Sequence, residues 1–383
     1  MLPFLSFIWL NTTIEVLRCF MKNYARVMNV DLSRYQRVIV LSDIHGDNDG
    51  FKATLSKLKF TNHDALVIVG DILEKGHQSL ELLNNIMELY KQGNIYMVLG
   101  NNDTFFSEWF NDEVTDQDIL GYMNSRDTSV LIEMANELNL EYKTIEQIIE
   151  FKNRIKEVYI NQIEFLDKLP HIIDSNIATF VHAGLKPGNL NNQEIDYCLT
   201  AWEFGNKTNK FDKLVVVGHW PTSNYCDGII SIMPYYNKLS NVISIDGGNS
   251  MKSWRQINYL IFDKKGNYVV DAYDALPKIR ILEKQVESKN PVSLIFPKTK
   301  LNVLNEKGDI CECYFPATDR TIEINKNTIY TYKNEIYCSD FTTYNLPTEI
   351  GDIVSFCKEL DNGILIKRNG IVGKYYGKYE FIE

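Results

Sequence analysis

Five short polar strings, each at the end of a run of β-type residues, constrain the fold of this chain more than any other feature. The runs that precede them are RVIVLS, ALVIV, IYMVL, ATFV and LVVV. The strings are D-I-H-G at 43–46, G-D at 70–71, G-N-N-D at 100–103, V-H-A-G at 181–184 and G-H-W-P at 218–221. Open α/β sheets place their sites beyond the carboxyl ends of their strands. We therefore expect the five strings to converge on one site.

The spacing of the strings predicts the order of the elements. Asp71 follows Asp43 by 28 residues and precedes Asn101 by 30, and each interval suits one strand, one helix and the next strand. The residue pattern predicts crossover helices at 51–58 and 79–90 and later strands at 177–181, 214–217, 242–245 and 257–262.

Three segments follow from these patterns. Residues 1–30 form an N-terminal helical extension, with an amphipathic helix over 13–27. Residues 31–277 form an α/β catalytic domain, and apolar residues at helical spacing predict a helical insertion at about 105–169 that folds over the site. Residues 278–383 alternate short apolar runs with turn residues, which predicts a small all-β domain. Its segment GDIVSF…GILIKRNGIVGKYY resembles a bacterial SH3-type barrel.

Composition excludes several classes of function. The formal net charge of −10 argues against a broad DNA- or RNA-binding surface, because such a surface needs clustered Lys and Arg. The apolar stretch 2–10 is shorter than the ~20 residues of a membrane-spanning helix, and no Lys or Arg precedes it as in a signal peptide. Seven cysteines without a framework spacing indicate reduced thiols and a cytoplasmic location.

The strings supply six candidate metal ligands with oxygen or imidazole donors, which suit Mn²⁺, Fe or Zn²⁺. These are Asp43, His45, Asp71, Asn101, His182 and His219. A carboxylate can bridge two cations, so Asp71 in the middle string is the bridging candidate. We expect two divalent ions, with Mn²⁺ favoured. Two such ions lower the pKa of a shared water, so that a bridging hydroxide forms near neutral pH.

The set of strings resembles the calcineurin-like metallophosphoesterase superfamily, with D-x-H-G, G-D-x-x-x-x-G, G-N-x-D, H-A-G and G-H in order. VHAGLKPG at 181–188, Pro221 after G-H-W and the stretch NVISIDGGNSMKSWRQINYLIFD favour its bacterial phosphoprotein-phosphatase branch. That branch includes Ser/Thr protein phosphatases and symmetrical diadenosine tetraphosphate hydrolases. The resemblance covers roughly 37–263 and implies a two-sheet αββα sandwich with the metals at the strand ends.

Several residues depart from the family pattern. The family's G-D-x-x-D-R-G is GDILEKG here, with Glu74 and Lys75 in place of Asp and Arg. Lys75 can still hold a phosphate, but as a point charge. Leu99 replaces an Arg, and Asn102 replaces the His that protonates the leaving group in the family. That His pairs with the Asp that is Glu74 here, so both partners have changed, and Asn cannot supply the proton.

Three interpretations of this loss stay open. The substrate has a good leaving group, another residue donates the proton, or the chain has become a binding protein. His77 and Asp103 are the nearest alternative donors in sequence, so Asn102, Asp103, Lys75 and His77 are the catalytic candidates. All metal ligands survive, which favours an enzyme over a binding protein.

The sequence therefore predicts a cytoplasmic, metal-dependent phosphatase that hydrolyses phosphate esters in the manner of a protein phosphatase. A nucleotide or dinucleoside-polyphosphate hydrolase is the alternative, and a metal-containing scaffold protein is the second. The expected substrate is a phosphorylated protein or a nucleotide. The C-terminal β domain is a candidate binding site for a protein partner.

Overall fold

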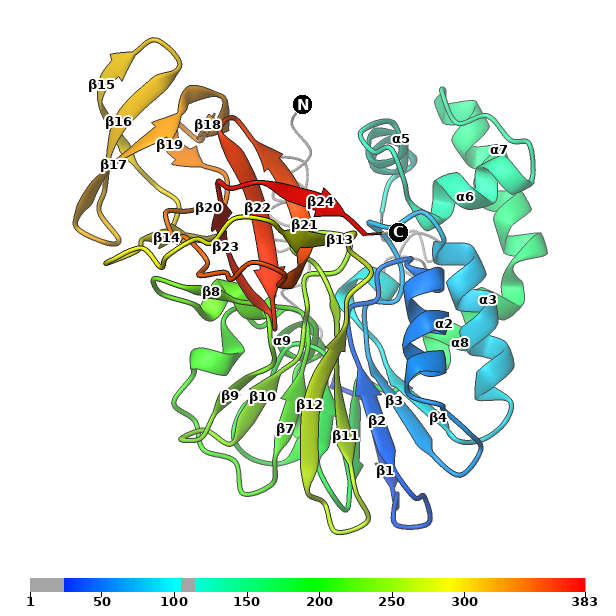
Figure 1. Cartoon of the computed structure of the whole chain (residues 1–383). Coiled ribbons are helices and arrows are strands. Elements are labelled where there is room, and N and C mark those ends of the chain that lie inside the picture. The colour runs from blue at the N-terminus through cyan, green and yellow to red at the C-terminus, as the bar shows by residue number, and fades with distance from the viewer. Residues whose placement is uncertain (1–23, 105–113, 383) are drawn as a thin grey trace. The chain divides into compact units, whose positions relative to one another are not determined.

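The computed structural model describes residues 24–104 and 114–382, and these divide into two units (Figure 1). The first unit is Met1–Pro221 with Pro234–Asp274, and the second is Thr222–Met233 with Ala275–Glu383. The later boundary lies three residues before the predicted one at 277. The sequence analysis did not predict that Thr222–Met233 belongs to the second unit.

The first sheet of the first unit contains the strands that precede the first three strings. Its elements are β2 (Val38–Leu41), α2 (Asn48–Lys57), β3 (Ala65–Val69), α3 (Ser79–Tyr90), β4 (Ile95–Val98), β11 (Ile257–Phe262) and β12 (Tyr268–Tyr273). The strand order is β12-β11-β2-β3-β4, and β2, β3 and β4 are parallel. Helices α2 and α3 connect the parallel strands, as the βαβ spacing predicts.

The second sheet of this unit contains the strands that precede His182 and His219. Its order is β1-β5-β6-β7-β10-β9. The strands are β1 (Val27–Val30), β5 (Ile172–Ser175), β6 (Thr179–Val181), β7 (Val215–Val217), β9 (Tyr235–Asn237) and β10 (Val242–Ser244). Residues 1–23 of the predicted helical extension lie outside the described residues. Its last four residues form β1 instead of a helix, because β-branched Val27 and Val30 pair with the edge of β5.

Alternating side chains build the layers of this unit, since successive residues of a strand point to opposite faces. Val40 and Val67 of the first sheet pack against Phe180 and Val216 of the second. The opposite face of the first sheet packs on α2 and α3. The outer face of the second sheet packs on α9 (Ile195–Thr200). The predicted two-sheet α/β fold is confirmed.

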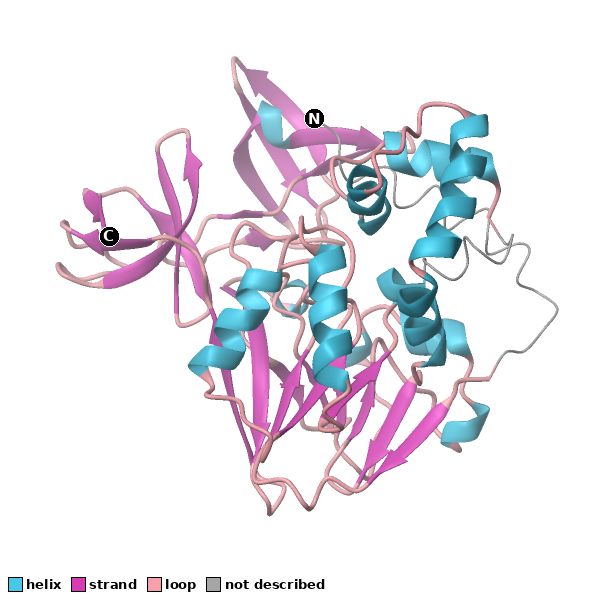
Figure 2. Ribbon diagram, turned by 90° about the vertical axis from the view of Figure 1, so that its right-hand side faces the viewer, coloured by secondary structure: helices cyan, strands magenta, loops and turns pink. Residues whose placement is uncertain are grey.

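The predicted helical insertion is present between the third and fourth strings. Its helices are α5 (Asp116–Asn124), α6 (Val130–Glu137), α7 (Ile145–Val158) and α8 (Ile160–Lys168). Side chains of Thr115, Ser129 and Thr144 accept backbone N–H groups at the starts of α5, α6 and α7, which explains where these helices begin. Apolar side chains of the insertion join the core cluster that includes α3. Figure 2 shows these helices in cyan beside the magenta strands.

The second unit is all β, as predicted. Its largest sheet has the order β24-β13-β21-β22-β23-β8, and all its neighbouring strands are antiparallel. Those strands are β8 (Ile230–Ser231), β13 (Lys278–Ile281), β21 (Ile353–Leu360), β22 (Gly363–Arg368), β23 (Ile371–Tyr375) and β24 (Tyr379–Phe381). The similarity to an SH3-type barrel stays a prediction.

Smaller sheets complete the second unit. They pair β14 (Ser293–Leu294) with β20 (Phe341–Thr342), β18 (Ile329–Tyr332) with β19 (Glu335–Cys338), and β15 (Asn302–Lys307) with β16 (Ile310–Phe315) and β17 (Arg320–Asn325). One apolar cluster lies under the large sheet, and another gathers side chains of these smaller sheets.

A helix with the length and apolar character of a membrane span is absent from residues 24–104 and 114–382.

Candidate metal centre

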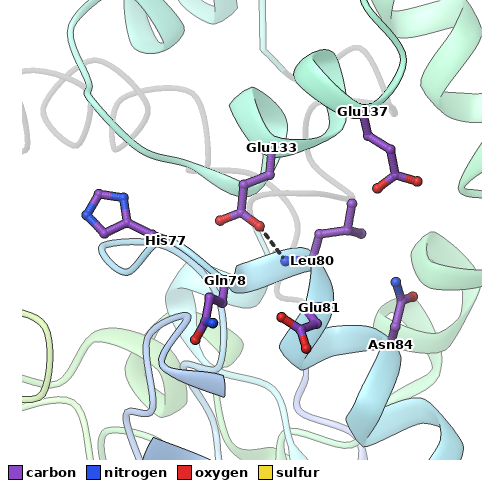
Figure 3. Close-up of a pocket in the computed structure, with 7 residues that line it drawn as sticks. All are labelled: His77, Gln78, Leu80, Glu81, Asn84, Glu133 and Glu137. Atoms are coloured by element: carbon purple, nitrogen blue, oxygen red, sulfur yellow. Dashed lines mark hydrogen bonds between the residues drawn. The ribbon is translucent and has the colours of Figure 1, made fainter. Parts of the chain in front are cut away.

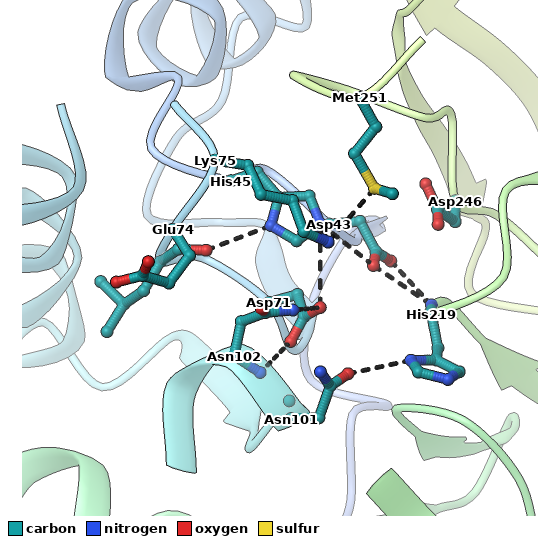
Figure 4. Close-up of polar contacts among 12 residues, drawn as sticks. Asp43, His45, Asp71, Glu74, Lys75, Asn101, Asn102, His219, Asp246 and Met251 are labelled. Atoms are coloured by element: carbon teal, nitrogen blue, oxygen red, sulfur yellow. Dashed lines mark hydrogen bonds and ion pairs between the residues drawn. The ribbon is translucent and has the colours of Figure 1, made fainter. Parts of the chain in front are cut away.

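All six predicted metal ligands lie just beyond strands of the first unit, and the structure brings them together. Figure 4 labels Asp43, His45, Asp71, Asn101 and His219 among them. They fall into two groups that share Asp71. One group contains Asp43, His45 and Asp71, and the other contains Asp71, His182 and His219. Within each group, the candidate ligand atoms lie within 4.8 Å of one another.

Asp71 has the geometry that a bridging carboxylate needs, because its two oxygens face different groups. Its Oδ2 lies 3.7 Å from Nε2 of His45, and its Oδ1 lies 3.4 Å from Nε2 of His182. The Oδ1 atom of Asn101 lies 3.0 Å from Nε2 of His182 and 2.9 Å from Nδ1 of His219. Asn101 therefore belongs with the second group.

Backbone groups orient the ligand side chains. Nδ1 of His45 lies 3.1 Å from the carbonyl oxygen of Leu73, and Nδ1 of His182 lies 2.9 Å from that of Val69. Each ring thus presents Nε2 to the centre, as in metal sites where a second hydrogen bond fixes the tautomer. The backbone N–H of His219 donates to Asp43, which ties the fifth string to the first.

Four of the six ligands have a left-handed backbone conformation. Their φ angles are 50° at Asp43, 50° at His45, 54° at Asp71 and 65° at His219. Each such residue costs on the order of 1–3 kcal/mol and persists only where the surrounding structure enforces it. These turns direct side chains from separate strands toward one point. Strain of this kind clusters at functional sites.

Asp103 enforces the turn at Asp71. Its carboxylate accepts backbone N–H groups of Asp71, Ile72, Leu73 and Gly100 at 2.8–3.1 Å. Burial and repulsion from Asp71 raise the pKa of Asp103 to about 7. Both carboxylate oxygens are thus engaged in bracing the loop that holds the central ligand.

Two glycines of the strings are required by close packing. A Cβ atom at Gly100 would overlap the backbone N and the Oδ1 of Asp71. A Cβ atom at Gly218 would overlap Oγ of Ser42 and Oδ2 of Asp43. The Ser42 hydroxyl also donates a hydrogen bond to Asp43. The ligand carboxylates leave no room for a side chain at either position.

Burial and neighbouring charges shift the pKa values of the three histidines. Burial and the charge of Lys75 lower the pKa of His45 to about 3, and burial and His182 lower that of His219 to about 3. Burial alone would lower the pKa of His182, but the carboxylates of Asp71 and Asp43 raise it to about 10. Two imidazoles are therefore neutral and ready to coordinate, while His182 holds a proton that a cation would displace.

Asn102 lies against the central carboxylate. Its side-chain amide donates to Oδ2 of Asp71 over 2.5 Å, and its backbone N–H donates to Oδ1 over 2.8 Å. Lys75 also reaches the centre, where its Nζ lies 3.1 Å from Nε2 of His45 and 3.2 Å from Sδ of Met251. The structure thus brings these two catalytic candidates to the ligands.

Glu74 points away from Asn102 and into the helical insertion. Its buried carboxylate accepts hydrogen bonds from the hydroxyl of Tyr122 at 2.5 Å, the hydroxyl of Ser129 at 3.0 Å and the backbone N–H of Val130 at 3.0 Å. Burial raises the pKa of Glu74 above its usual range. Glu133 of α6 in return accepts the N–H groups of Ser79 and Leu80, which begin α3. The insertion is anchored to the loop after Asp71.

His77 lies elsewhere, in a pocket of about 280 Å³ whose described lining contains none of the six ligands. Glu133 lines the same pocket, and Figure 3 shows its hydrogen bond to Leu80. The lining residues are His77, Gln78, Leu80, Glu81, Asn84, Glu133 and Glu137. The structure does not bring His77 into the ligand cluster, and its role as a proton donor stays a prediction.

One functional candidate was missed by the sequence analysis. Asp246 follows β10 and is buried beside the ligands (Figure 4). Its Oδ1 accepts the backbone N–H of Gly248 over 2.7 Å. Burial raises the pKa of Asp246 to about 6. The signal was present, because Asp246 ends a β-type run, VISI, as the five strings do.

The donor set fits two divalent cations. Asp71 faces both groups, each group adds neutral or anionic donors, and the carboxyls are buried where an uncompensated negative charge is costly. Carboxylate, amide and imidazole donors together suit Mn²⁺, Fe or Zn²⁺.

Comparisons with known proteins found similar solved structures and one matching family model. Similar solved structures include one named as a diadenosine tetraphosphatase, with 21% identity, a TM-score of 0.42 and coverage of 66% of this chain and 100% of that chain. A protein serine/threonine phosphatase from Saccharomyces cerevisiae has 11% identity, a TM-score of 0.41 and coverage of 70% and 90%. A cold-active protein-tyrosine phosphatase from a psychrophilic Shewanella has 16% identity, a TM-score of 0.37 and coverage of 65% and 82%.

A search of curated proteins found no match. The family model of the calcineurin-like phosphoesterases matches residues 36–258, which include all five strings. The chain belongs to the calcineurin-like phosphoesterase family.

Proposed function

We propose that this chain is a metal-dependent phosphatase that hydrolyses phosphate esters with poorly basic leaving groups. The observation that supports a two-metal centre most directly is Asp71, whose two oxygens face His45 and His182 in separate ligand groups. Mn²⁺ is the favoured ion, and Fe or Zn²⁺ is the alternative. When bound, two such ions lower the pKa of a shared water and neutralise charge on the phosphoryl oxygens.

The side chains of this centre have separate roles in the proposed function. Asp43 and His45 would hold one ion, Asn101, His182 and His219 would hold the other, and Asp71 would contribute to both sites. The ammonium of Lys75, at Nε2 of His45, supplies a positive charge that can attract a phosphate. Asp103 fixes the loop on which Asp71 and Lys75 lie.

The leaving group is the feature of the substrate that the site constrains. Asn102 stands in the position of the family's proton donor, and its amide is engaged with Asp71. The amide cannot protonate a departing alkoxide. A phenolate or a nucleotide phosphate needs no proton to leave. This supports phosphotyrosyl proteins, other aryl phosphates or nucleotide phosphoanhydrides as substrates over phosphoserine and phosphothreonine.

A hydrolase of nucleotides or dinucleoside polyphosphates is the second candidate function, and the same position of Asn102 supports it. A metal-containing scaffold protein is the third. We also propose that the second unit binds a protein partner. Its exposed apolar side chains, which include Val286, Ile350 and Phe381, support this proposal. The six cysteines among the described residues are free thiols, which supports a cytoplasmic location.

A substrate panel tests the proposed function. Protein supplemented with Mn²⁺ should hydrolyse p-nitrophenyl phosphate, and Asp71→Asn should remove that activity. Phosphotyrosine peptides, phosphoserine peptides and diadenosine tetraphosphate should then be compared at equal concentration. Turnover of diadenosine tetraphosphate alone would favour the second candidate. Metal binding without turnover of any member of the panel would contradict an enzyme and favour the scaffold.

A further inference from the structure

Asp246 presents a buried carboxylate oxygen that has no hydrogen-bond partner among the described residues. One oxygen, Oδ1, accepts the N–H of Gly248, while Oδ2 is buried and unpaired. The side chain is fully shielded from solvent. Leaving a buried polar atom unpaired costs on the order of 1–3 kcal/mol, and more for a charged group. A bound ligand would supply the hydrogen-bond donor that Oδ2 of Asp246 lacks.

Strand register places Asp246 level with a predicted metal ligand. Strands β10 and β7 are parallel neighbours, and Ser244 pairs with Val217. Asp246 and His219 each lie two residues beyond this pair, so both side chains emerge at the same edge of the sheet. Figure 4 shows the carboxyl of Asp246 near Asp43 and His219. Burial and then repulsion from Asp246 raise the pKa of Asp43 well above its usual range.

The charges of the centre indicate which kind of ligand would compensate its buried carboxyls. Asp43, Asp71 and Asp246 are three buried carboxyls, and their like charges repel one another. Burying such charges is costly unless cations compensate them. Two divalent cations would add positive charge to that of Lys75, whose ammonium already acts on Asp246.

We propose that Asp246 is a third carboxylate of the metal centre, whose unpaired Oδ2 accepts a hydrogen bond from water held by the two ions. This inference rests on the proposed two-metal function. Asp246 thereby acts as a positioning residue that raises metal affinity, in addition to the six ligands. Partners of this outer kind typically contribute 10- to 100-fold to metal affinity.

The test compares Asp246→Asn with a matched variant, Asp64→Asn. The amide at position 246 keeps an oxygen for the N–H of Gly248 but removes the charge. Asp64 is also a buried carboxylate of the first unit, bonded to Arg37 at 2.8 Å and located just before β3 begins, at the opposite end of that strand from Asp71. Removing its charge controls for the general effect of altering a buried carboxylate.

Mn²⁺ affinity and the stability of metal-free protein are the two readouts, measured by titration calorimetry and thermal unfolding. Asp246→Asn should weaken Mn²⁺ binding by about 10- to 100-fold, while metal-free protein keeps or gains thermal stability because a buried unpaired charge is lost. Asp64→Asn should lower stability and leave Mn²⁺ affinity unchanged.

Wild-type Mn²⁺ affinity in Asp246→Asn would overturn the inference. A metal-free Asp246→Asn protein that is destabilised or does not fold would also overturn it, because a structural role alone would then explain any weaker binding. The proposed function is judged separately by phosphate-ester turnover. Wild-type protein that binds Mn²⁺ without hydrolysing any ester would contradict that function, and the calorimetric comparison would still decide the role of Asp246.

Discussion

Asn102 and Asp71 are joined by two hydrogen bonds, from the side-chain amide to Oδ2 at 2.5 Å and from the backbone N–H to Oδ1 at 2.8 Å. The residue in the position of the family's proton donor therefore contacts the carboxylate that faces both candidate ligand groups. Glu74, in the position of that donor's partner in the family pattern, is bonded instead to Tyr122, Ser129 and Val130 of the insertion. This pair of changes leads to the first prediction.

Turnover of aryl phosphates should fall steeply as the pKa of the leaving phenol rises, because no group at Asn102 protonates it. Asn102→His should flatten this dependence and favour alkyl phosphates selectively. General acids contribute ~10²–10⁴-fold, so partial restoration is measurable in a series of substituted phenyl phosphates. Asn102→Ala, which adds no donor, should keep the steep dependence. A flat dependence in the wild type would show that another group already supplies the proton.

Asp71→Asn should remove both metal ions, because Asp71 alone faces both ligand groups. His219→Ala removes a ligand from only one group and should leave the other ion bound. Elemental analysis after metal-replete purification measures this as the number of ions per chain. Retention of two ions by Asp71→Asn would contradict the bridging role.

Metal loading should release protons at pH 8. Facing carboxylates raise the pKa of His182 to about 10, so the metal-free imidazole is protonated at pH 8 and must lose that proton to coordinate. Titrating Mn²⁺ into weakly buffered protein in a pH-stat should consume at least one equivalent of base per chain. Loading without base consumption would show that His182 is already neutral.

Tyr122→Phe should destabilise the first unit by ~1–3 kcal/mol, since it leaves an oxygen of the buried Glu74 carboxylate without a donor. Urea unfolding followed by circular dichroism measures the change. Tyr236→Phe is the matched control, because the hydroxyl of the partly exposed Tyr236 bonds to Asn241 at the surface. Equal stability of the two variants would show that the Glu74 anchor contributes little.

Acid should destabilise the metal-free protein partly through His171. Burial lowers the pKa of His171 to about 4, and its Nδ1 accepts the backbone N–H of Arg26. The unfolded state then binds more protons between pH ~6.5 and ~4, so stability falls as the pH drops through this window, by up to about 3 kcal/mol. His171→Asn keeps an acceptor but does not titrate, and it should flatten this part of the stability curve. Unfolding curves of wild type and variant that stay parallel between pH 6.5 and 4 would contradict this.

Much of the first unit was predictable because each ligand follows a β-type run, and that local pattern encodes both the strand and the side chain beyond it. Asp246 follows the same pattern after VISI, but its D-G-G context resembles a turn. The direction of Glu74 was not predictable, because it depends on Tyr122 and Val130, which lie far along the chain in the insertion.

The local sequence pattern also could not predict that Thr222–Met233 belongs to the second unit. Strand β8 is only two residues long, and its pairing with β23 joins Ser231 to Ile371. Only the distant partner reveals the strand. In the same way, β1 forms because an edge of the sheet at β5 is present, which residues 27–30 do not encode by themselves.

The position of β8 in the chain has a consequence for synthesis. On the ribosome, β8 emerges directly after the His219 string, whereas its partner β23 is among the last elements to appear. Strand β8 must therefore wait without its partner until translation is nearly complete. Pairings of such long sequence separation form slowly, and unpaired strand edges invite association with other chains. Strand β8 is thus a place where a nascent chain is exposed to misassembly and chaperone binding.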